Sequence, residues 1–229
     1  MGPAADGTTV HALAWWLLGV PGGVIFYGRF YVQWIASEIR KKSVMPVAFW
    51  YMSTLGGLML FAYAVYDRVP LGALGQCFSI TVYCRNLIHI RREKGSLSRL
   101  AHFALHAGVA LVTFVAIVLT IGTWLSEYEA TKHVTVEEAR DTWFWLAVGV
   151  VGQILFASRF LVQWIATERE RKSVVPTAFW HLSVVASALQ LATFTQRREW
   201  IFAAGMIATL LIYLRNLWFI RSKGMTDTE

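Results

Sequence analysis

The stretch RFYVQWIASEIRKKSVMPVAFWYMS at residues 29–53 recurs without gaps as RFLVQWIATERERKSVVPTAFWHLS at residues 159–183, and 16 of the 25 aligned positions are identical. The same displacement along the chain carries YCRNL at 83–87 onto YLRNL at 213–217. Shared hydrophobicity alone does not produce identity of this extent, so the pattern indicates an internal duplication.

Composition places the duplicated sequence in a membrane. Of the 229 residues, 56% are apolar and 15% are charged, whereas a soluble domain has about 25% charged residues. This composition excludes a soluble enzyme, a disordered tail and a disulfide scaffold. The net charge of +7 does not indicate a nucleic acid partner, because basic residues in so apolar a chain mark the cytoplasmic ends of membrane helices.

Seven stretches are long enough to span a bilayer, since a helix needs roughly 20 apolar residues to cross the hydrocarbon core. They are 11–36, 46–66, 69–90, 100–125, 142–166, 176–194 and 200–220. We therefore expect an all-α integral membrane protein with seven transmembrane helices in a 3+1+3 arrangement. The expected parts are a first three-helix repeat at 1–95, a linker helix at 96–130 and a second three-helix repeat at 131–229. The unmatched linker helix makes the repeats parallel, and a substrate site is expected where such repeats meet.

The distribution of basic residues predicts the orientation of these helices. The loops on the side of the N-terminus carry five Lys or Arg residues. Those on the side of the C-terminus carry twelve, including Arg40, Lys41 and Lys42 in the first repeat and Arg171 and Lys172 in the second. The positive-inside rule then places the N-terminus outside and the C-terminus in the cytoplasm.

Four arginines lie inside the predicted spans, as two repeat-related pairs: Arg29 with Arg159, and Arg85 with Arg215. An arginine at the bilayer centre costs roughly 2.5–3.5 kcal/mol on insertion scales. The nearest acids lie nine residues beyond the first pair, about 13 Å along a helix; they are Glu38 and Glu168. Something must therefore compensate the charge of these arginines.

Three interpretations of the arginines remain open from the sequence. Arg85 and Arg215 are close enough to the cytoplasmic interface for their side chains to snorkel to it. Alternatively, the arginines meet the two carboxylates across the repeat interface, or stack on aromatic rings such as Trp34 and Trp164. In the third interpretation an anion completes the site, because a guanidinium is a planar fork suited to phosphate and keeps its charge.

Amide side chains extend the predicted site. Gln33 and Gln163 follow the deeper arginines by four residues and share a helical face with them. Asn86 and Asn216 adjoin the second pair but point about 100° away, so interhelical hydrogen bonds explain them as well as ligand contact does. The candidate substrate-binding residues are Arg29, Gln33, Trp34, Glu38, Arg85, Asn86, Arg159, Gln163, Trp164, Glu168, Arg215 and Asn216. No catalytic constellation, metal or cofactor is predicted.

The run RFxVQWIAxE, followed by KSVxPxAFWxxS and YxRNL, resembles the membrane domain found at the N-terminus of some lipid-A-disaccharide synthases. The resemblance covers nearly everything except the middle span and the polar ends, and it makes the chain similar to a tandem duplication of that domain. The family is in turn similar to a wider group that includes SWEET sugar transporters, PQ-loop proteins and the KDEL receptor. The chain ends nine residues after Ile220, without the soluble glycosyltransferase domain of that family, so we expect that it is not an enzyme.

Together, the arginines, the repeats and the resemblance predict a transporter or flippase-type carrier. Its cargo would be an anionic lipid-linked sugar or isoprenoid phosphate of lipid A or cell-envelope glycolipid biosynthesis, with a polyprenyl glycosyltransferase as a further partner. The expected location is the bacterial inner membrane. One alternative is a non-catalytic membrane scaffold that recruits a glycosyltransferase. The other is a SWEET-like carrier of neutral sugars, although a neutral cargo would leave the arginines without a counter-charge.

Overall fold

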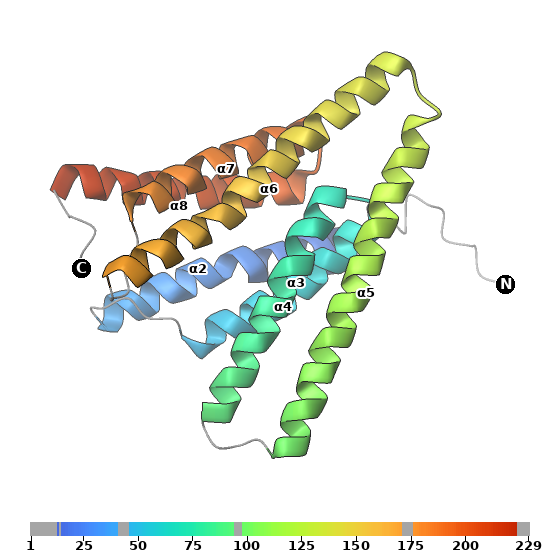
Figure 1. Cartoon of the computed structure of the whole chain (residues 1–229). Coiled ribbons are helices and arrows are strands. Elements are labelled where there is room, and N and C mark those ends of the chain that lie inside the picture. The colour runs from blue at the N-terminus through green and yellow to red at the C-terminus, as the bar shows by residue number, and fades with distance from the viewer. Residues whose placement is uncertain (1–12, 14, 41–45, 94–97, 171–175, 224–229) are drawn as a thin grey trace. The chain divides into compact units, whose positions relative to one another are not determined.

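The structure, a computed structural model, describes residues 13, 15–40, 46–93, 98–170 and 176–223, and no strand occurs among them. The chain divides into two compact units, Met1–His133 and Val134–Glu229. In Figure 1 the first unit runs from blue to green and the second from yellow to red. The basic residues expected in the cytoplasmic loops at Lys41, Lys42, Arg171 and Lys172 lie outside the described residues.

Each unit contains one copy of the repeated helices. The first unit consists of a π-helix η1 (Trp15–Gly19) and the helices α2 (Val20–Arg40), α3 (Val47–Tyr66), α4 (Pro70–Glu93) and α5 (Arg99–Thr131). The second consists of α6 (Val136–Glu170), α7 (Thr177–Gln196) and α8 (Trp200–Lys223). Helices α7 and α8 begin and end at the residues that align with the ends of α3 and α4 in the sequence repeat. The duplication is therefore visible in the helices themselves.

Repeated residues also set the ends of the repeated helices. Pro46 and Pro176 are the N-cap residues of α3 and α7, with the same φ of −67° and ψ of 150°. Proline suits the start of a helix, where a backbone N–H would have no partner. After these helices the chain turns through Arg68 and Arg198, whose φ values of 55° and 59° are left-handed. The same strained backbone therefore recurs in both copies.

The first helix of the two copies differs near its N-terminal end, where only the first copy has a proline, Pro21. Proline has no N–H and its ring crowds the carbonyl four residues earlier, which for Pro21 is the carbonyl of Leu17 in η1. A π-helical turn widens the backbone and relieves that crowding. The second copy has Val151 at the equivalent position, and α6 is α-helical over its whole length.

Within each unit, the central helix packs against both of its neighbours in the repeat. In the first unit α3 contacts α2 and α4, and in the second α7 contacts α6 and α8. A Cβ atom placed on Gly56 of α3 would lie 2.6 Å from the backbone nitrogen of Phe26 in α2. Only glycine therefore allows these two helices to approach so closely.

The middle helix α5 belongs to the first unit, where it packs against α4. It is 33 residues long, and many of its large apolar side chains are exposed, among them Leu111 and Phe114. Its C-terminal end leads to Thr135 and Glu138, which form a capping box at the start of α6. The amide of Glu138 donates to the Thr135 hydroxyl at 3.3 Å, and the amide of Thr135 donates to the Glu138 carboxylate at 3.0 Å.

Five helices of the described chain are long and apolar enough to cross a membrane. They are α3, α5, α6, α7 and α8, and they indicate a multi-pass membrane protein. The prediction of seven spans exceeds this finding, because α2 and α4 do not meet the same criterion. Their arginines do not explain this difference, because α6 and α8 carry the equivalent Arg159 and Arg215 and still meet the criterion.

Candidate functional site

Arg29 of α2 is buried among aromatic rings in the first unit. Its side chain is only 7% exposed. The guanidinium carbon lies 3.7 Å from the ring centroid of Phe26, 5.2 Å from that of Phe49 and 5.0 Å from that of Tyr83. Phe30 contributes a fourth ring at 4.9 Å. These rings come from α2, α3 and α4, so all three helices of the repeat surround one cation.

The hydrogen-bonding capacity of Arg29 is not used up by its surroundings. Its Nε and Nη1 atoms are buried and have no hydrogen-bond partner among the described residues. Aromatic faces attract a cation through the ring quadrupole, but they offer no acceptor to N–H groups in the guanidinium plane. A buried charged donor without an acceptor is costly. The first unit therefore holds a fixed positive charge with donors available for an anion.

Arg159 of α6 occupies the equivalent position in the second unit, where it is 8% exposed. Its guanidinium carbon lies 3.5 Å from the Phe156 ring centroid and 5.2 Å from that of Phe179. Here Nη1 donates to the Tyr213 hydroxyl at 2.7 Å and, more weakly, to the Ser183 hydroxyl at 3.4 Å. One nitrogen of the second guanidinium, Nη1, is thus hydrogen-bonded to oxygen atoms of its own unit, whereas its Nε makes no such bond within the described residues.

The rings around the two arginines also recur in both copies, at positions that align in the same way as Arg29 and Arg159. They pair as Phe26 with Phe156, Phe49 with Phe179, and Tyr83 with Tyr213. None of these residues is among the site residues predicted from the sequence. The available signal was their identity in both copies, together with the three-residue spacing that places Phe26 on the same helical face as Arg29.

The other pair of arginines lies in a different environment. Arg85 in α4 and Arg215 in α8 are both exposed. The Asn86 side chain donates to the Val82 carbonyl of its own helix at 2.8 Å, and Asn216 is half-buried. The structure therefore separates the four predicted arginines into a buried pair and an exposed pair.

The remaining predicted site residues lie at the margin of the buried arginines. Gln33 and Gln163 are half-buried, whereas Glu38 and Glu168 are exposed. Trp34 is 52% exposed, and the side chain of Trp164 lies outside what the structure describes. Within the described residues, no carboxylate forms an ion pair with Arg29.

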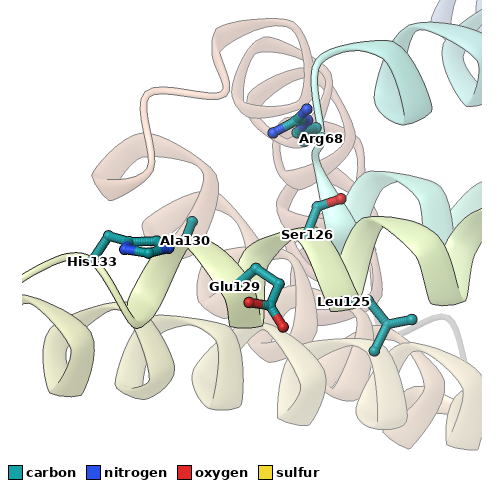
Figure 2. A pocket seen from close by; sticks show the side chains of 6 residues that line it. All are labelled: Arg68, Leu125, Ser126, Glu129, Ala130 and His133. Carbon is teal, nitrogen blue, oxygen red and sulfur yellow. The ribbon is translucent and has the colours of Figure 1, made fainter.

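A separate pocket lies at the far end of α3 in the first unit. Figure 2 shows Arg68, from the turn after α3, together with side chains of the last turns of α5 and the residues that follow it. The pocket has a volume of about 410 Å³ and is lined by Arg68, Leu125, Ser126, Glu129, Ala130 and His133. Phe49 lies in the first turn of α3, so the 20 residues of that helix, about 30 Å, separate the pocket from Arg29.

The carboxylate of this pocket already has a counter-charge. Glu129 accepts a hydrogen bond from the ammonium of Lys132 at 2.8 Å. This contact raises the pKa of Lys132 above its ordinary value. Both side chains are exposed to solvent, where such pairs are weak. The pocket shows no group comparable with the buried, incompletely bonded guanidinium of Arg29.

The arginine sites have the chemistry to bind an anion. A guanidinium does not lose its charge in a protein, and it presents planar donors that match phosphate and carboxylate oxygens. No cluster of three or more metal-ligating side chains occurs in the part of the chain that the structure describes.

The sequence profile of the Lipid A Biosynthesis N-terminal domain matches the chain twice, at residues 18–88 and 148–218. Each matched region contains one buried arginine and, beside it, one repeated aromatic ring from each of the three helices of its copy. The two matched regions together cover more than half of the 229 residues. No solved structure matches the chain, and the predicted relation to SWEET and PQ-loop proteins stays a prediction.

Curated relatives carry the name of lipid-A-disaccharide synthases. The chain is 26% identical to that of Chlamydia felis over 217 residues, which are 94% of this chain and 34% of the relative. It is 28% identical to that of Chlamydia trachomatis serovar D over 185 residues, 78% of this chain and 30% of the relative. The chain therefore spans about a third of the length of the curated relatives it matches.

The expectation that the protein is not an enzyme was wrong, because these relatives contradict it. The matched proteins are named as an enzyme and share most of this chain. The expectation rested on the end of the sequence soon after Ile220. Because the relatives are about three times as long as the matched part, the end of this sequence carries no information about a glycosyltransferase domain.

Proposed function

Since the chain belongs to the Lipid A Biosynthesis N-terminal domain family, we propose that it binds an anionic lipid of lipid A or cell-envelope glycolipid biosynthesis and carries it across the bilayer. The cargo is a lipid-linked sugar or an isoprenoid phosphate, and its phosphate group is bound by the buried arginines. The proposal includes seven spans in the 3+1+3 arrangement, a location in the bacterial inner membrane, and an N-terminus outside the cell.

The observation that carries this proposal is the incomplete hydrogen bonding of Arg29. Its charge is 7% exposed, and its Nε and Nη1 atoms have no partner among the described residues. An arginine in the apolar core of a membrane is costly and usually marks a functional site. A phosphate oxygen would supply the acceptor that four aromatic rings do not.

The membrane and the family both favour a lipid as the ligand. A buried cation between membrane-spanning helices is reached most readily by an amphiphile that already resides in the bilayer. The family name and the names of the relatives concern lipid A biosynthesis, in which the relevant lipids carry both phosphate and sugar groups. The half-buried amides of Gln33 and Gln163 are suited to hydrogen bonds with sugar hydroxyls.

The proposal is tested by the lipids that stay with the purified protein. The full chain is purified in mild detergent, its bound lipids are extracted, and lipid-linked sugars and isoprenoid phosphates are quantified by mass spectrometry, separately from the phospholipids of the bilayer. In the variant Arg29→Gln/Arg159→Gln the amount of bound cargo lipid should fall by about tenfold or more. A hydrogen bond to a charged group contributes roughly 1.5–3 kcal/mol, and 1.4 kcal/mol corresponds to a factor of ten in affinity. Equal amounts of the same lipids in the wild type and this variant would overturn the proposal.

The exposed pair of arginines provides the matched control. Arg85→Gln/Arg215→Gln removes two charges from the same chain but leaves the buried guanidinium groups in place. This variant should retain the phosphorylated lipid at the wild-type level. Both double variants are first compared by thermal unfolding in detergent, so that loss of lipid is read only from folded protein.

The relatives favour a second candidate function, in which the chain is the membrane part of a lipid-A-disaccharide synthase system. In that case the bound lipid is delivered to a glycosyltransferase instead of being carried across the bilayer. Reconstituted vesicles distinguish the two candidates. A carrier moves a fluorescent lipid phosphate between leaflets when no other protein is present, whereas a delivery module does not.

A further inference from the structure

A groove runs along the first unit between α4 and α5, with one contribution from α3. Its volume is about 360 Å³. The walls are aliphatic, with Leu87 and Ile88 on α4 facing Leu105, Val109 and Val112 on α5. In the second unit, the described chain has no helix that packs against α8 as α5 packs against α4. The groove therefore belongs to one copy of the repeat only.

Small residues of α5 leave the groove open. Gly108 lines it, and a Cβ atom placed on this glycine would meet no atom within 4 Å. Ala104 lies one turn earlier on the same helical face and also lines the groove. These two small residues, one helical turn apart, thus leave a groove between α5 and α4 that the protein's own side chains do not fill.

One end of the groove is polar. Arg91, in the last turn of α4, donates a hydrogen bond to the Tyr51 hydroxyl at 3.3 Å, and both residues line the groove. The hydroxyls of Thr81 and Thr113 are 2.8 Å apart and fix the register of α4 against α5. In this antiparallel register Arg91 lies beside the first turns of α5, and the aliphatic walls lead away from it toward Val112.

An apolar furrow with a cation at one end has the chemistry of a lipid site. The furrow matches a hydrocarbon chain, and a guanidinium beside a phenol hydroxyl matches a phosphodiester oxygen. Arg91 and Tyr51 are both exposed, as expected for groups that meet a headgroup at the membrane surface. The helix that forms one wall, α5, is a candidate membrane span with mostly exposed apolar residues. The occupant therefore comes from the surrounding bilayer.

We propose that this α4–α5 groove binds one acyl chain of an anionic phospholipid of the bilayer, whose headgroup phosphate is bound by Arg91 and Tyr51. This phospholipid is a resident lipid of the first unit and differs from the cargo proposed for Arg29. The inference requires that the protein lies in a membrane, but it does not depend on the carrier function.

Gly108→Leu tests the groove without disturbing the fold. The added side chain enters open space, and removal of a glycine from a helix interior favours the helix. Delipidated full-length protein in detergent is titrated with phosphatidylglycerol and, separately, with phosphatidylcholine, and bound lipid is counted by native mass spectrometry. The wild type should bind one phosphatidylglycerol in preference to phosphatidylcholine. Gly108→Leu should weaken this binding by about tenfold or more, a factor that corresponds to 1.4 kcal/mol.

Two further variants show whether the groove itself is responsible for the binding. Gly122→Leu is the matched control, because Gly122 is in the same helix, has the same open space around its Cβ position and does not line the groove. It should bind phosphatidylglycerol like the wild type. Arg91→Gln should abolish the preference for the anionic lipid. Equal binding by Gly108→Leu and Gly122→Leu, or no lipid preference in the wild type, would show non-specific annular lipid only and overturn the proposal.

The test is independent of the proposed carrier function. Arg29→Gln/Arg159→Gln leaves the groove unchanged and should bind phosphatidylglycerol as the wild type does. If this variant loses the cargo lipid and keeps the phosphatidylglycerol, both proposals stand. If the groove variants have no effect, only the groove proposal fails.

Discussion

Removing one hydroxyl group should distinguish the two buried arginines from each other. In the second unit, Nη1 of Arg159 donates to the Tyr213 hydroxyl at 2.7 Å, which is the short distance typical of a charge-assisted hydrogen bond. Tyr213→Phe removes this acceptor and leaves the 3.4 Å contact with Ser183. A hydrogen bond to a charged group contributes roughly 1.5–3 kcal/mol, so the free energy of unfolding should fall by about that amount.

The equivalent substitution in the first unit is the control. Tyr83 places its ring 5.0 Å from the guanidinium carbon of Arg29, but Nε and Nη1 of Arg29 donate to no acceptor among the described residues, the Tyr83 hydroxyl included. Tyr83→Phe keeps the ring face and its attraction for the cation. Its effect on the free energy of unfolding should therefore stay below about 0.5 kcal/mol, as for a substitution that removes no specific contact.

The assay is unfolding of the full chain in detergent micelles, followed by far-ultraviolet circular dichroism during a denaturant titration. The comparison between the two variants is more informative than either value alone, because both lose the same atom from equivalent helices. If Tyr213→Phe and Tyr83→Phe lower stability equally, the two sites have the same hydrogen bonding, and the distinction between the arginines is wrong.

Two further predictions concern packing and capping. Gly56→Val should destabilise the protein by about 1–3 kcal/mol, because its Cβ would lie 2.6 Å from the Phe26 backbone nitrogen and force α2 away from α3; wild-type stability in the same titration would contradict the close approach. Thr135→Ala should cost about 0.5–2 kcal/mol through loss of the capping box with Glu138. Amide hydrogen exchange in the first turn of α6 should then accelerate, and unchanged protection there would show that the cap is not needed.

The helices of the second copy could be predicted closely from those of the first. The displacement between the two copies carries Val47 and Tyr66, the ends of α3, onto Thr177 and Gln196, the ends of α7. This succeeds because a duplicated sequence repeats its caps and turns as well as its apolar residues. The number of membrane spans was harder to predict, since α2 and α4 do not meet the criterion that α6 and α8 meet, although the equivalent helices carry equivalent arginines.

Stacking of the arginines on aromatic rings was one interpretation open from the sequence, but the rings that surround them were not identified from it. Phenylalanine and tyrosine occur throughout these apolar helices, and those that face lipid have the same spacing as those that face a neighbouring helix. Tyr83 is far from Arg29 in the sequence and lies on a different helix. Only the packing of α3 against both α2 and α4 brings such residues together. The hydroxyl that distinguishes Arg159 from Arg29 is present in both copies, so sequence identity conceals that difference.

The wide turn before Pro21 has a consequence for the symmetry of the two halves. A π-helical turn holds one residue more than an α-helical path would, and one residue corresponds to a rotation of about 100° about the helix axis. Trp15, the first residue of this turn, places its ring edge-on against Tyr63, at 5.9 Å between centroids. The equivalent residues of the second half meet through a hydrogen bond instead, which the Thr193 hydroxyl donates to the Trp145 carbonyl at 3.3 Å. Two like halves thus join their first and middle helices by unlike contacts at the same place.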